Sequence, residues 1–204
     1  SGAFDDPEID ELELKNFPGL DPHKVVSGPI ELGAVTELMA EVGEVDAIWT
    51  DPPWGPGLLK WFYTHNKNRQ ERIDWEEFLM VFAQVCAEYC PAGPIYIAMG
   101  KDHVDILATH MEEAGIYERN RYEVYYQSSG GPRPCVIWAG SGSRTVEFPL
   151  GIPEEIVYGS GKNPPLDRVV KWCLQNHPDL ESVLDTCCGK GQTAKVALSL
   201  GLTF

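Results

Sequence analysis

The residues best suited to chemistry begin at position 51, where a carboxylate is followed by two prolines and a tryptophan. The run Asp51-Pro52-Pro53-Trp54 directly follows residues 45–50, an apolar segment with the composition of a buried strand. Consecutive prolines fix two φ angles, remove two N–H donors and keep the preceding residue out of the helical region. The expected corner presents a carboxylate, backbone carbonyls and an aromatic face. A plain proline-rich turn explains the run alone almost as well, but open α/β sheets bind ligands at the carboxyl ends of strands.

A second run, from Asp185 to Thr193, has the pattern of a strand end, a glycine turn and a helix start. Gly189 and Gly191 would let the backbone approach a ligand, and the following helix offers free N–H groups. A phosphate-binding P-loop does not fit, because no glycine opens that motif upstream of Lys190 and no Ser or Thr follows it. A dinucleotide motif is incomplete, since no acidic residue follows about 20 positions later. The turn is either a ligand site of another kind or a plain strand–helix connection.

Basic and aromatic residues follow the first run. Residues 55–73 hold four Lys or Arg against Glu71, a local charge of +3. This strip either meets phosphates and closes over a target base or is a solvated polar loop, and the two interpretations are equally good. Its members are Lys60, Lys67, Arg69 and Arg72, with Trp61, Phe62, Tyr63 and His65 between and beside them. Arg119, Arg121 and Arg133 are candidates to extend the strip, whereas Trp49, Trp75, Trp138 and Trp172 are expected in the core.

Charge and cysteine content exclude several classes of protein. The formal net charge is −15 and the pI is about 4.6, which argues against a protein that grips nucleic acid over a broad basic face. Residues 1–47 carry 12 acids against Lys15 and Lys24, and residues 1–20 are expected to form a flexible acidic arm. The six cysteines form no CxxC pair, so no metal site is expected and reduced thiols in the cytoplasm are the simple interpretation. We find neither an apolar run long enough to span a membrane nor a signal segment.

Strands and amphipathic helices alternate along the chain. Asp74 and Glu77 have the spacing of a capping box before an apolar helical face, and residues 128–134 have the composition of a mobile loop. This alternation predicts an α/β domain with a mostly parallel sheet. The expected strands are 45–50, 95–99, 122–127, 135–139 and 183–185, and the expected helices are 35–42, 74–90, 102–114, 166–173 and 192–200.

Taken together, the two runs resemble the motifs of the S-adenosylmethionine-dependent amino-methyltransferases, the adenine-N6 and cytosine-N4 group. In that family an Asp/Asn/Ser-Pro-Pro-aromatic motif follows one strand, and a motif like Asp-Pro-Phe-Cys-Gly-Ser-Gly follows another. Asp51-Pro52-Pro53-Trp54 matches the first, and residues 185–191 resemble the second, with Thr186 and Cys187 in place of Pro and Phe. The catalytic motif comes first, as in the permuted β-type enzymes. Lys162 lies in a segment, 161–166, that is similar to the Lys-Pro-Leu element of that order.

The resemblance spans residues 25–204 and implies a fold and a site. The fold would be a Rossmann-like, doubly wound, mostly parallel sheet with an antiparallel strand pair, in circularly permuted order, forming one domain over residues 21–204. Both motifs would open into one crevice. The implied catalytic residues are Asp51, Pro52, Pro53 and Trp54. The implied residues for S-adenosylmethionine are Asp185, Thr186, Cys187, Gly189, Gly191, Gln192, Thr193 and Lys162, with no metal required.

The implied function is methyl transfer from S-adenosylmethionine to an exocyclic amino group of a base, with adenine N6 in DNA favoured over cytosine N4 and RNA. An acidic residue of the family's next strand usually holds the ribose, and this sequence ends at Phe204 as that strand begins, so the domain is expected to be cut short. With no room for a target-recognition domain, low sequence specificity, a partner subunit or a homodimer is expected. A catalytically silent scaffold subunit, or an enzyme that methylates glutamine or another amine, remains an alternative hypothesis.

Overall fold

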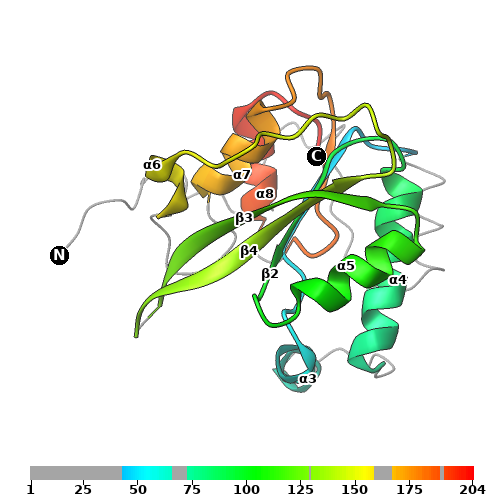
Figure 1. Ribbon diagram of the computed structural model, residues 1–204, viewed down its shortest axis with the longest axis vertical. Coiled ribbons are helices and arrows are strands. Elements are labelled where there is room, and N and C mark those ends of the chain that lie inside the picture. Colours follow the sequence, from blue (N-terminus) through cyan, green and yellow to red (C-terminus); the bar gives the residue numbers. More distant parts are fainter. Residues whose placement is uncertain (1–42, 66–72, 129, 159–166, 189–190) are drawn as a thin grey trace.

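The computed structural model describes residues 43–65, 73–128, 130–158, 167–188 and 191–204. The predicted acidic arm and the predicted helix 35–42 lie outside these ranges. Within them, five strands form one sheet in the order β3-β4-β2-β1-β5 (Figure 1). Their bounds are β1 Ala47–Thr50, β2 Ile95–Met99, β3 Tyr117–Ser128, β4 Gly131–Ser141 and β5 Val183–Leu184.

The sheet is mixed. Strand β1 lies parallel to β2 and to β5, whereas β4 is antiparallel to both β2 and β3. The two central parallel strands are buried along their whole length, as their unbroken apolar sequences predict. The expected α/β fold with an antiparallel strand pair is confirmed, although β4 also joins β2 antiparallel, so the parallel share of the described sheet is smaller than expected.

Helices cover both faces of the sheet, which makes it doubly wound (Figure 1). One core cluster joins α3, α4 and α5 to the inward side chains of β1 and β2, and a second cluster joins α7 and α8 to their opposite face. In β1, for example, Ile48 enters the first cluster while its neighbours Ala47 and Trp49 enter the second. The helices are α3 Pro56–His65, α4 Trp75–Tyr89, α5 Val104–Glu113, α6 Glu154–Val157, α7 Asp167–Gln175 and α8 Gln192–Ser199.

Helix α4 begins where the capping box predicts. The Asp74 carboxylate accepts a 2.9 Å hydrogen bond from the backbone N–H of Glu77, and the helix ends before Pro91. All seven residues predicted for its apolar face are buried, namely Trp75, Phe78, Leu79, Phe82, Val85, Cys86 and Tyr89. Helix α4 therefore packs against the sheet through the stripe that its sequence encodes.

Most of the segment predicted as a mobile loop, 128–134, belongs instead to the two strands of a long hairpin: Ser128 ends β3, and residues 131–134 begin β4. Strands β3 and β4 pair from Tyr117–Ser141 to Ser128–Gly131, and Pro132 and Pro134 lie within β4. Strand β2 pairs with β4 only from Val136 onward, so the prolines occupy a stretch where β4 has no second neighbour in the described sheet. A missing N–H is tolerated at such an edge. The loop prediction was wrong because proline composition does not reveal which side of a strand is paired.

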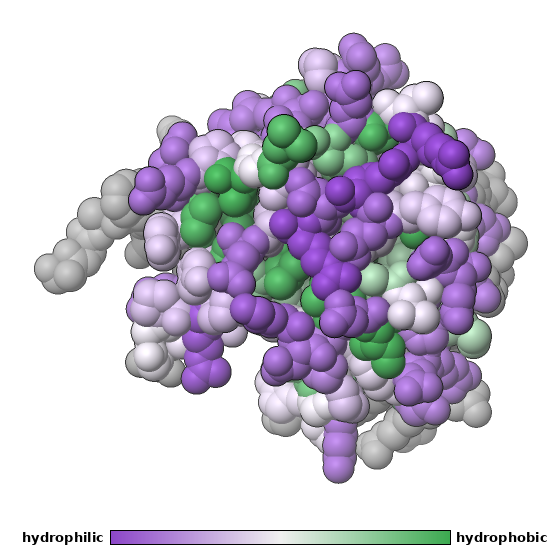
Figure 2. Space-filling model, in the orientation of Figure 1, coloured by the Kyte–Doolittle hydropathy of each residue, from purple (hydrophilic) through white to green (hydrophobic). Residues whose placement is uncertain are grey.

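The last residues return to the sheet. Thr203 forms a parallel bridge with Ser182, and its carbonyl accepts from the Val183 N–H at 2.9 Å. Residues predicted to begin the next strand therefore lie beside β5. The face seen in Figure 2 is mostly hydrophilic, with smaller hydrophobic areas between polar side chains. Among the described residues, none of the helices has the length and apolar character needed to span a membrane.

Candidate active site

The two motif-bearing connections leave the sheet at the same edge. Ala47 and Ile48 of β1 align with Val183 and Leu184 of β5, and because the strands are parallel, their carboxyl ends coincide. Two residues further on, the hydroxyls of Thr50 and Thr186 lie 3.2 Å apart, within hydrogen-bond distance. Residues 136 positions apart in the chain therefore meet between the proline corner and the glycine turn.

The proline corner holds its carboxylate and its tryptophan against each other. The indole N–H of Trp54 donates a 2.8 Å hydrogen bond to Oδ1 of Asp51. Pro52 is buried, whereas Asp51, Pro53 and Trp54 are half-buried. Asp51 and Trp54 are thus joined by a hydrogen bond across Pro52 and Pro53, whose backbones are restricted.

The tryptophan ring is also positioned from β2 and β3. Tyr126 packs on it edge to face, with ring centroids 5.5 Å apart and planes at 75°. Gly100 follows β2, and a Cβ atom at Gly100 would lie 3.3 Å from the Cβ of Trp54 and 3.4 Å from its ring. A residue without a side chain at position 100 therefore lets the indole lie close to the end of β2.

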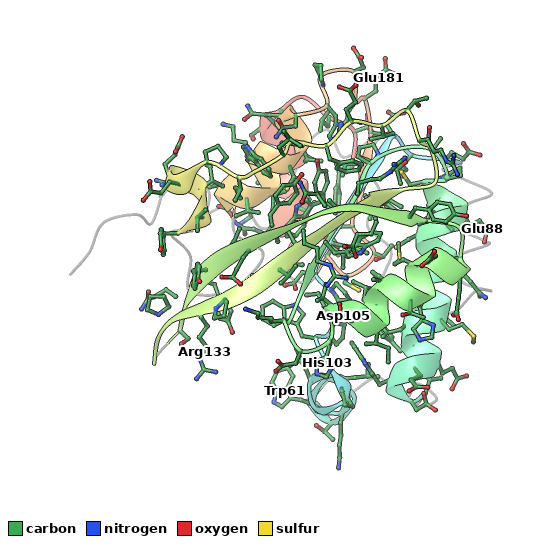
Figure 3. The ribbon with its side chains drawn as sticks, in the orientation of Figure 1. Trp61, Glu88, His103, Asp105, Arg133 and Glu181 are labelled. Carbon is green, nitrogen blue, oxygen red and sulfur yellow. The ribbon has the colours of Figure 1, made fainter. Side chains whose placement is uncertain are left out.

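A histidine lies against the backbone just after the corner. A Cβ atom at Gly55 would lie 2.5 Å from Nε2 of His103, so glycine is needed there for the ring to approach. His103 also contacts Trp75 edge to face, with centroids 5.8 Å apart. In Figure 3, His103 and Trp61 lie at the end of the molecule toward which the hairpin with Arg133 extends, and Glu181, just before β5, lies at the opposite end.

Burial raises the pKa of the Asp51 carboxyl well above that of an ordinary aspartate. The pKa of Asp51 is raised from 3.8 to about 7, chiefly by loss of solvation; the Trp54 hydrogen bond lowers it, and the nearby Asp185 adds to the increase. Thiol groups of Cys135 and Cys187 also face this carboxyl, and burial raises the pKa of each thiol. Asp51 therefore changes its charge close to neutral pH.

Asp185 organises the second turn from within. It is buried, and its two carboxylate oxygens accept hydrogen bonds from the backbone N–H of Cys187, at 2.9 Å, and from the hydroxyl of Thr193. Burial outweighs these contacts and raises the pKa of Asp185. In this arrangement Asp185 and Thr193 shape the turn, and both side chains point into the protein.

The helix that follows the turn starts at a left-handed glycine. Gly191 has a φ of 76° at the N-cap of α8, a conformation that residues with a side chain rarely adopt. Its backbone N–H donates to the Cys188 carbonyl at 2.6 Å, and the next side chain, Gln192, donates to Asp167 of α7. The α8 N-terminus therefore lies beside the start of α7, and Thr193 ties it to Asp185 at the end of β5. Gly189 and Lys162, both predicted to bind the cofactor, lie outside the described residues.

The predicted basic strip is only partly described. Lys60 is exposed on α3, and Trp61 beside it is 48% exposed. Arg133 is exposed near the tip of the hairpin (Figure 3). Lys67, Arg69 and Arg72 lie outside the described residues, as do the side chains of Phe62, Tyr63 and His65.

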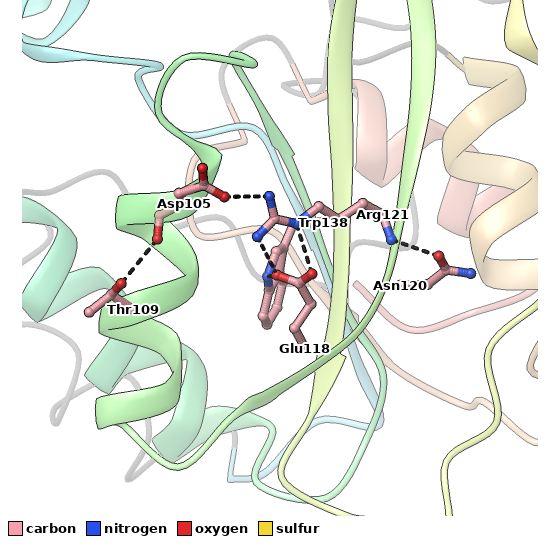
Figure 4. Close-up of polar contacts among 6 residues, drawn as sticks. All are labelled: Asp105, Thr109, Glu118, Asn120, Arg121 and Trp138. Atoms are coloured by element: carbon pink, nitrogen blue, oxygen red, sulfur yellow. Dashed lines mark hydrogen bonds and ion pairs between the residues drawn. The ribbon is translucent and has the colours of Figure 1, made fainter.

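Two arginines do not extend the strip, and that prediction was wrong. Arg121 forms ion pairs with Glu118, at 2.7 Å, and with Asp105 (Figure 4). Arg119 donates to the Ser143 carbonyl at 3.1 Å. Both lie near the start of β3, which pairs with the last residues of β4. Those residues of β4 pair with the start of β2, whereas the proline corner lies at the carboxyl ends of the parallel strands. Sequence position alone could not reveal that the hairpin carries them away from the corner.

Three further residues contribute to the site without having been singled out as functional residues. Thr50 is a fully buried polar residue at the end of an apolar strand, which is a local signal. Tyr126 and His103 reach the corner only through the hairpin and the β2–α5 connection, so no local signal marks them. The predicted core tryptophans are confirmed, since Trp49, Trp75 and Trp138 are buried and Trp172 packs against the second core cluster.

All six cysteines are free thiols. Within the described ranges, no group of three or more His, Cys, Asp or Glu side chains could hold a metal ion.

The chain matches no family model and no curated protein sequence. Its fold, however, is similar to solved structures. The M1.HpyAVI–S-adenosylmethionine complex matches with a TM-score of 0.54 and 17% identity, covering 84% of this chain and 86% of that one. TTHA0409 of Thermus thermophilus, assigned as a DNA modification methylase and complexed with S-adenosyl-L-methionine, matches with a TM-score of 0.56 and 16% identity, covering 83% and 82%. This chain shares its fold with these two proteins. The Rossmann-like expectation from the resemblance is thereby confirmed at the level of the fold.

Proposed function

We propose that this protein is an S-adenosylmethionine-dependent methyltransferase that modifies an exocyclic amino group of a base in DNA, with adenine N6 favoured over cytosine N4. The single observation that carries the proposal is the 3.2 Å contact between Thr50 and Thr186, because it brings the proline corner and the glycine turn to one edge of the sheet. The similar fold of a DNA modification methylase complexed with S-adenosylmethionine supports the same assignment.

The cofactor would lie over the glycine turn and the start of α8. A left-handed Gly191 lets the backbone approach a ligand, and the helix N-terminus offers N–H groups without intrahelical partners. S-Adenosylmethionine supplies a methyl group already activated by the sulfonium. We propose that Thr186, Cys187, Gly189, Gly191, Gln192 and Lys162 contact it, while Asp185 and Thr193 hold the turn in shape.

The proline corner would prepare the acceptor. An exocyclic amine is a poor nucleophile because its lone pair is delocalised into the base. Acceptors aimed at its two N–H bonds favour the pyramidal form, and the Asp51 carboxylate and the Pro52 carbonyl can accept without donating. The remaining task of the protein is to align the acceptor nitrogen with the methyl group.

We propose that the phosphates of the DNA meet Lys60, Lys67, Arg69 and Arg72, and that a base from a duplex is flipped into the site. RNA as the substrate, a partner subunit, a homodimer and a cytoplasmic location stay predictions from the sequence. The single domain over residues 21–204 is likewise a proposal.

The decisive experiment incubates the protein with isotope-labelled S-adenosylmethionine and separate DNA, RNA and protein pools, followed by mass spectrometry of nucleosides and peptides. We expect label in N6-methyladenine from DNA. Label in N4-methylcytosine or in RNA would correct the acceptor, and label in a protein amine would replace the function. No transfer to any pool, together with little S-adenosylmethionine binding by calorimetry, would favour the silent scaffold.

Substitution of Asp51 tests the chemistry. We expect Asp51→Ala to lower the transfer rate about 100-fold or more, because an acceptor for the target amine is lost, while calorimetry finds S-adenosylmethionine binding largely unchanged. Asp179→Asn is the matched control, an exposed carboxylate before β5 at the opposite edge of the sheet. Wild-type activity in Asp51→Ala would refute the assignment.

A further inference from the structure

The hydrogen bond inside the proline corner gives Trp54 a task beyond presenting an aromatic face. Its indole N–H donates to Oδ1 of Asp51 at 2.8 Å. Among the described residues, this is the side-chain donor that contacts the Asp51 carboxyl. An indole N–H can only donate, so it occupies Oδ1 of Asp51 as a donor and leaves the lone pairs of Oδ2 to accept from a target amine.

We propose that Trp54 is a positioning residue, whose indole N–H fixes one oxygen of the Asp51 carboxylate and leaves Oδ2 to accept from the amino group of the target base. This inference rests on the proposed function, and it concerns the edge of the indole rather than its face. A phenylalanine at position 54 would keep an aromatic face but lack the donor.

The surroundings of Trp54 make this contact a fixed one. The two prolines restrict the backbone between the partners, Tyr126 packs on the ring from β3, and Gly100 leaves room for it at the end of β2. The indole is therefore held from three directions, and a preorganised donor loses little conformational entropy when it holds the carboxylate in place.

The charges around Asp51 explain why such a donor is needed. Asp185 faces it from the end of β5, and the thiols of Cys187 and Cys135 face it from the glycine turn and from β4. Burial and Asp185 both disfavour the carboxylate form, whereas the Trp54 hydrogen bond favours it. Without the indole N–H, a larger fraction of Asp51 would be protonated at neutral pH and unable to accept two hydrogen bonds.

The test removes the N–H and keeps the shape. Site-specific replacement of Trp54 by benzothienylalanine exchanges the N–H for sulfur, and Trp54→Phe is the simpler second variant. The pH dependence of the transfer rate is measured for each, together with the titration of the ¹³C-labelled Asp51 carboxyl by NMR. The matched control places benzothienylalanine at Trp172, which packs on Tyr122 with ring centroids 5.1 Å apart, away from the corner.

We expect the acid limb of the rate profile, and the Asp51 titration, to move upward by about one pH unit in both Trp54 variants, because a hydrogen bond to a charged group is lost. At pH 9 the benzothienylalanine variant should recover most of the wild-type rate, since its aromatic face is unchanged. The Trp172 control should keep the wild-type profile.

An unchanged Asp51 titration in both variants would overturn the proposal, and so would a loss of rate that is equal at every pH. The NMR titration needs no turnover. A protein that transfers no methyl group but shows the shift would refute the proposed function alone, whereas an active protein without the shift would refute the role of Trp54 alone. If Trp54→Phe unfolds, the benzothienylalanine variant decides.

Discussion

Asp51, a half-buried residue whose carboxyl pKa is raised to about 7, is the most informative single residue of this protein. An aspartate at the surface would be ionised throughout the neutral range, so its charge would tell little about function. Asp51 instead lies half-buried between Trp54 and Asp185, and in the proposed function its ionised form offers both oxygens as acceptors. Perturbed acidity of this kind is common at functional sites.

The pH dependence of stability follows from the same residue. The folded pKa lies above the unfolded value of 3.8, so between these values the folded state binds more protons and stability falls as pH rises. Asp51→Asn removes this loss while keeping an acceptor for Trp54. We expect the variant to gain about 2 kcal/mol relative to wild type between pH 5.5 and pH 8.5, measured by urea unfolding at both pH values.

The control for this prediction is Asp179→Asn, whose stability relative to wild type should change little over the same range. Asp185, whose pKa is also raised by burial, adds pH dependence of the same sign to both proteins. Because Asp185 and Asp51 interact, the Asp185 carboxyl is titrated by NMR in both proteins and its contribution is subtracted. A constant difference between wild type and Asp51→Asn at the two pH values would show that Asp51 is ionised at pH 5.5.

At the scale of elements, the parallel pairing of β1 with β5 assembles the site. It sets Thr50 beside Thr186, although 136 positions separate them. Thr186 stands where the resembling family has proline, and a proline could not make this contact. The contact therefore joins the two motif-bearing connections through a hydroxyl that the usual proline would not supply.

A double-mutant cycle measures that bond. We expect Thr50→Val and Thr186→Val each to destabilise the protein, since each leaves a hydroxyl without its partner, and the pair to show a coupling free energy of about 0.5–1.5 kcal/mol in urea unfolding. The exposed hydroxyl pair Ser143 and Thr145, 2.8 Å apart, offers a control cycle whose coupling should be near zero. Strictly additive effects at Thr50 and Thr186 would contradict the link.

The β3–β4 hairpin shows that the composition of a short segment does not reveal its pairing in the sheet. Residues 128–134 are rich in Gly, Pro and Ser, yet β4 begins at Gly131, because Pro132 and Pro134 lie where β2 does not reach. The same hairpin brings Tyr126 to Trp54 and ties Arg121 to Glu118 and Asp105. Pairing over eleven positions with β3 outweighs the local signal for a loop.

At the scale of the whole molecule, charge limits how DNA can be held. The net charge is −15, and the predicted contacts with phosphates come from four basic residues that follow the proline corner in the sequence. Long-range attraction to a polyanion is therefore weak, and in the proposed function binding would depend on this short strip and on the flipped base. Weak, local binding of this kind agrees with the expectation of low sequence specificity.

The salt dependence of DNA binding tests this limit. With about four phosphate contacts or fewer, the logarithm of the association constant should fall with the logarithm of salt concentration with a slope no steeper than about −3.6 for duplex DNA. Lys60→Gln should reduce the slope by about 0.9. Fluorescence anisotropy between 50 and 200 mM salt measures both, and a slope of −6 or steeper would reveal a basic surface that the sequence does not indicate.

Local sequence alone determined much of this protein. The unbroken apolar runs predicted β1 and β2, the 74–77 capping box predicted the start of α4, and the proline corner and glycine turn marked the candidate site, because periodicity, caps and prolines act over a few residues. Only the tertiary structure decided which side chains surround Asp51, where the hairpin carries its arginines, and that Asp185 faces inward. These contacts arise from strand order and burial, which bring distant residues together and which no short window of sequence contains.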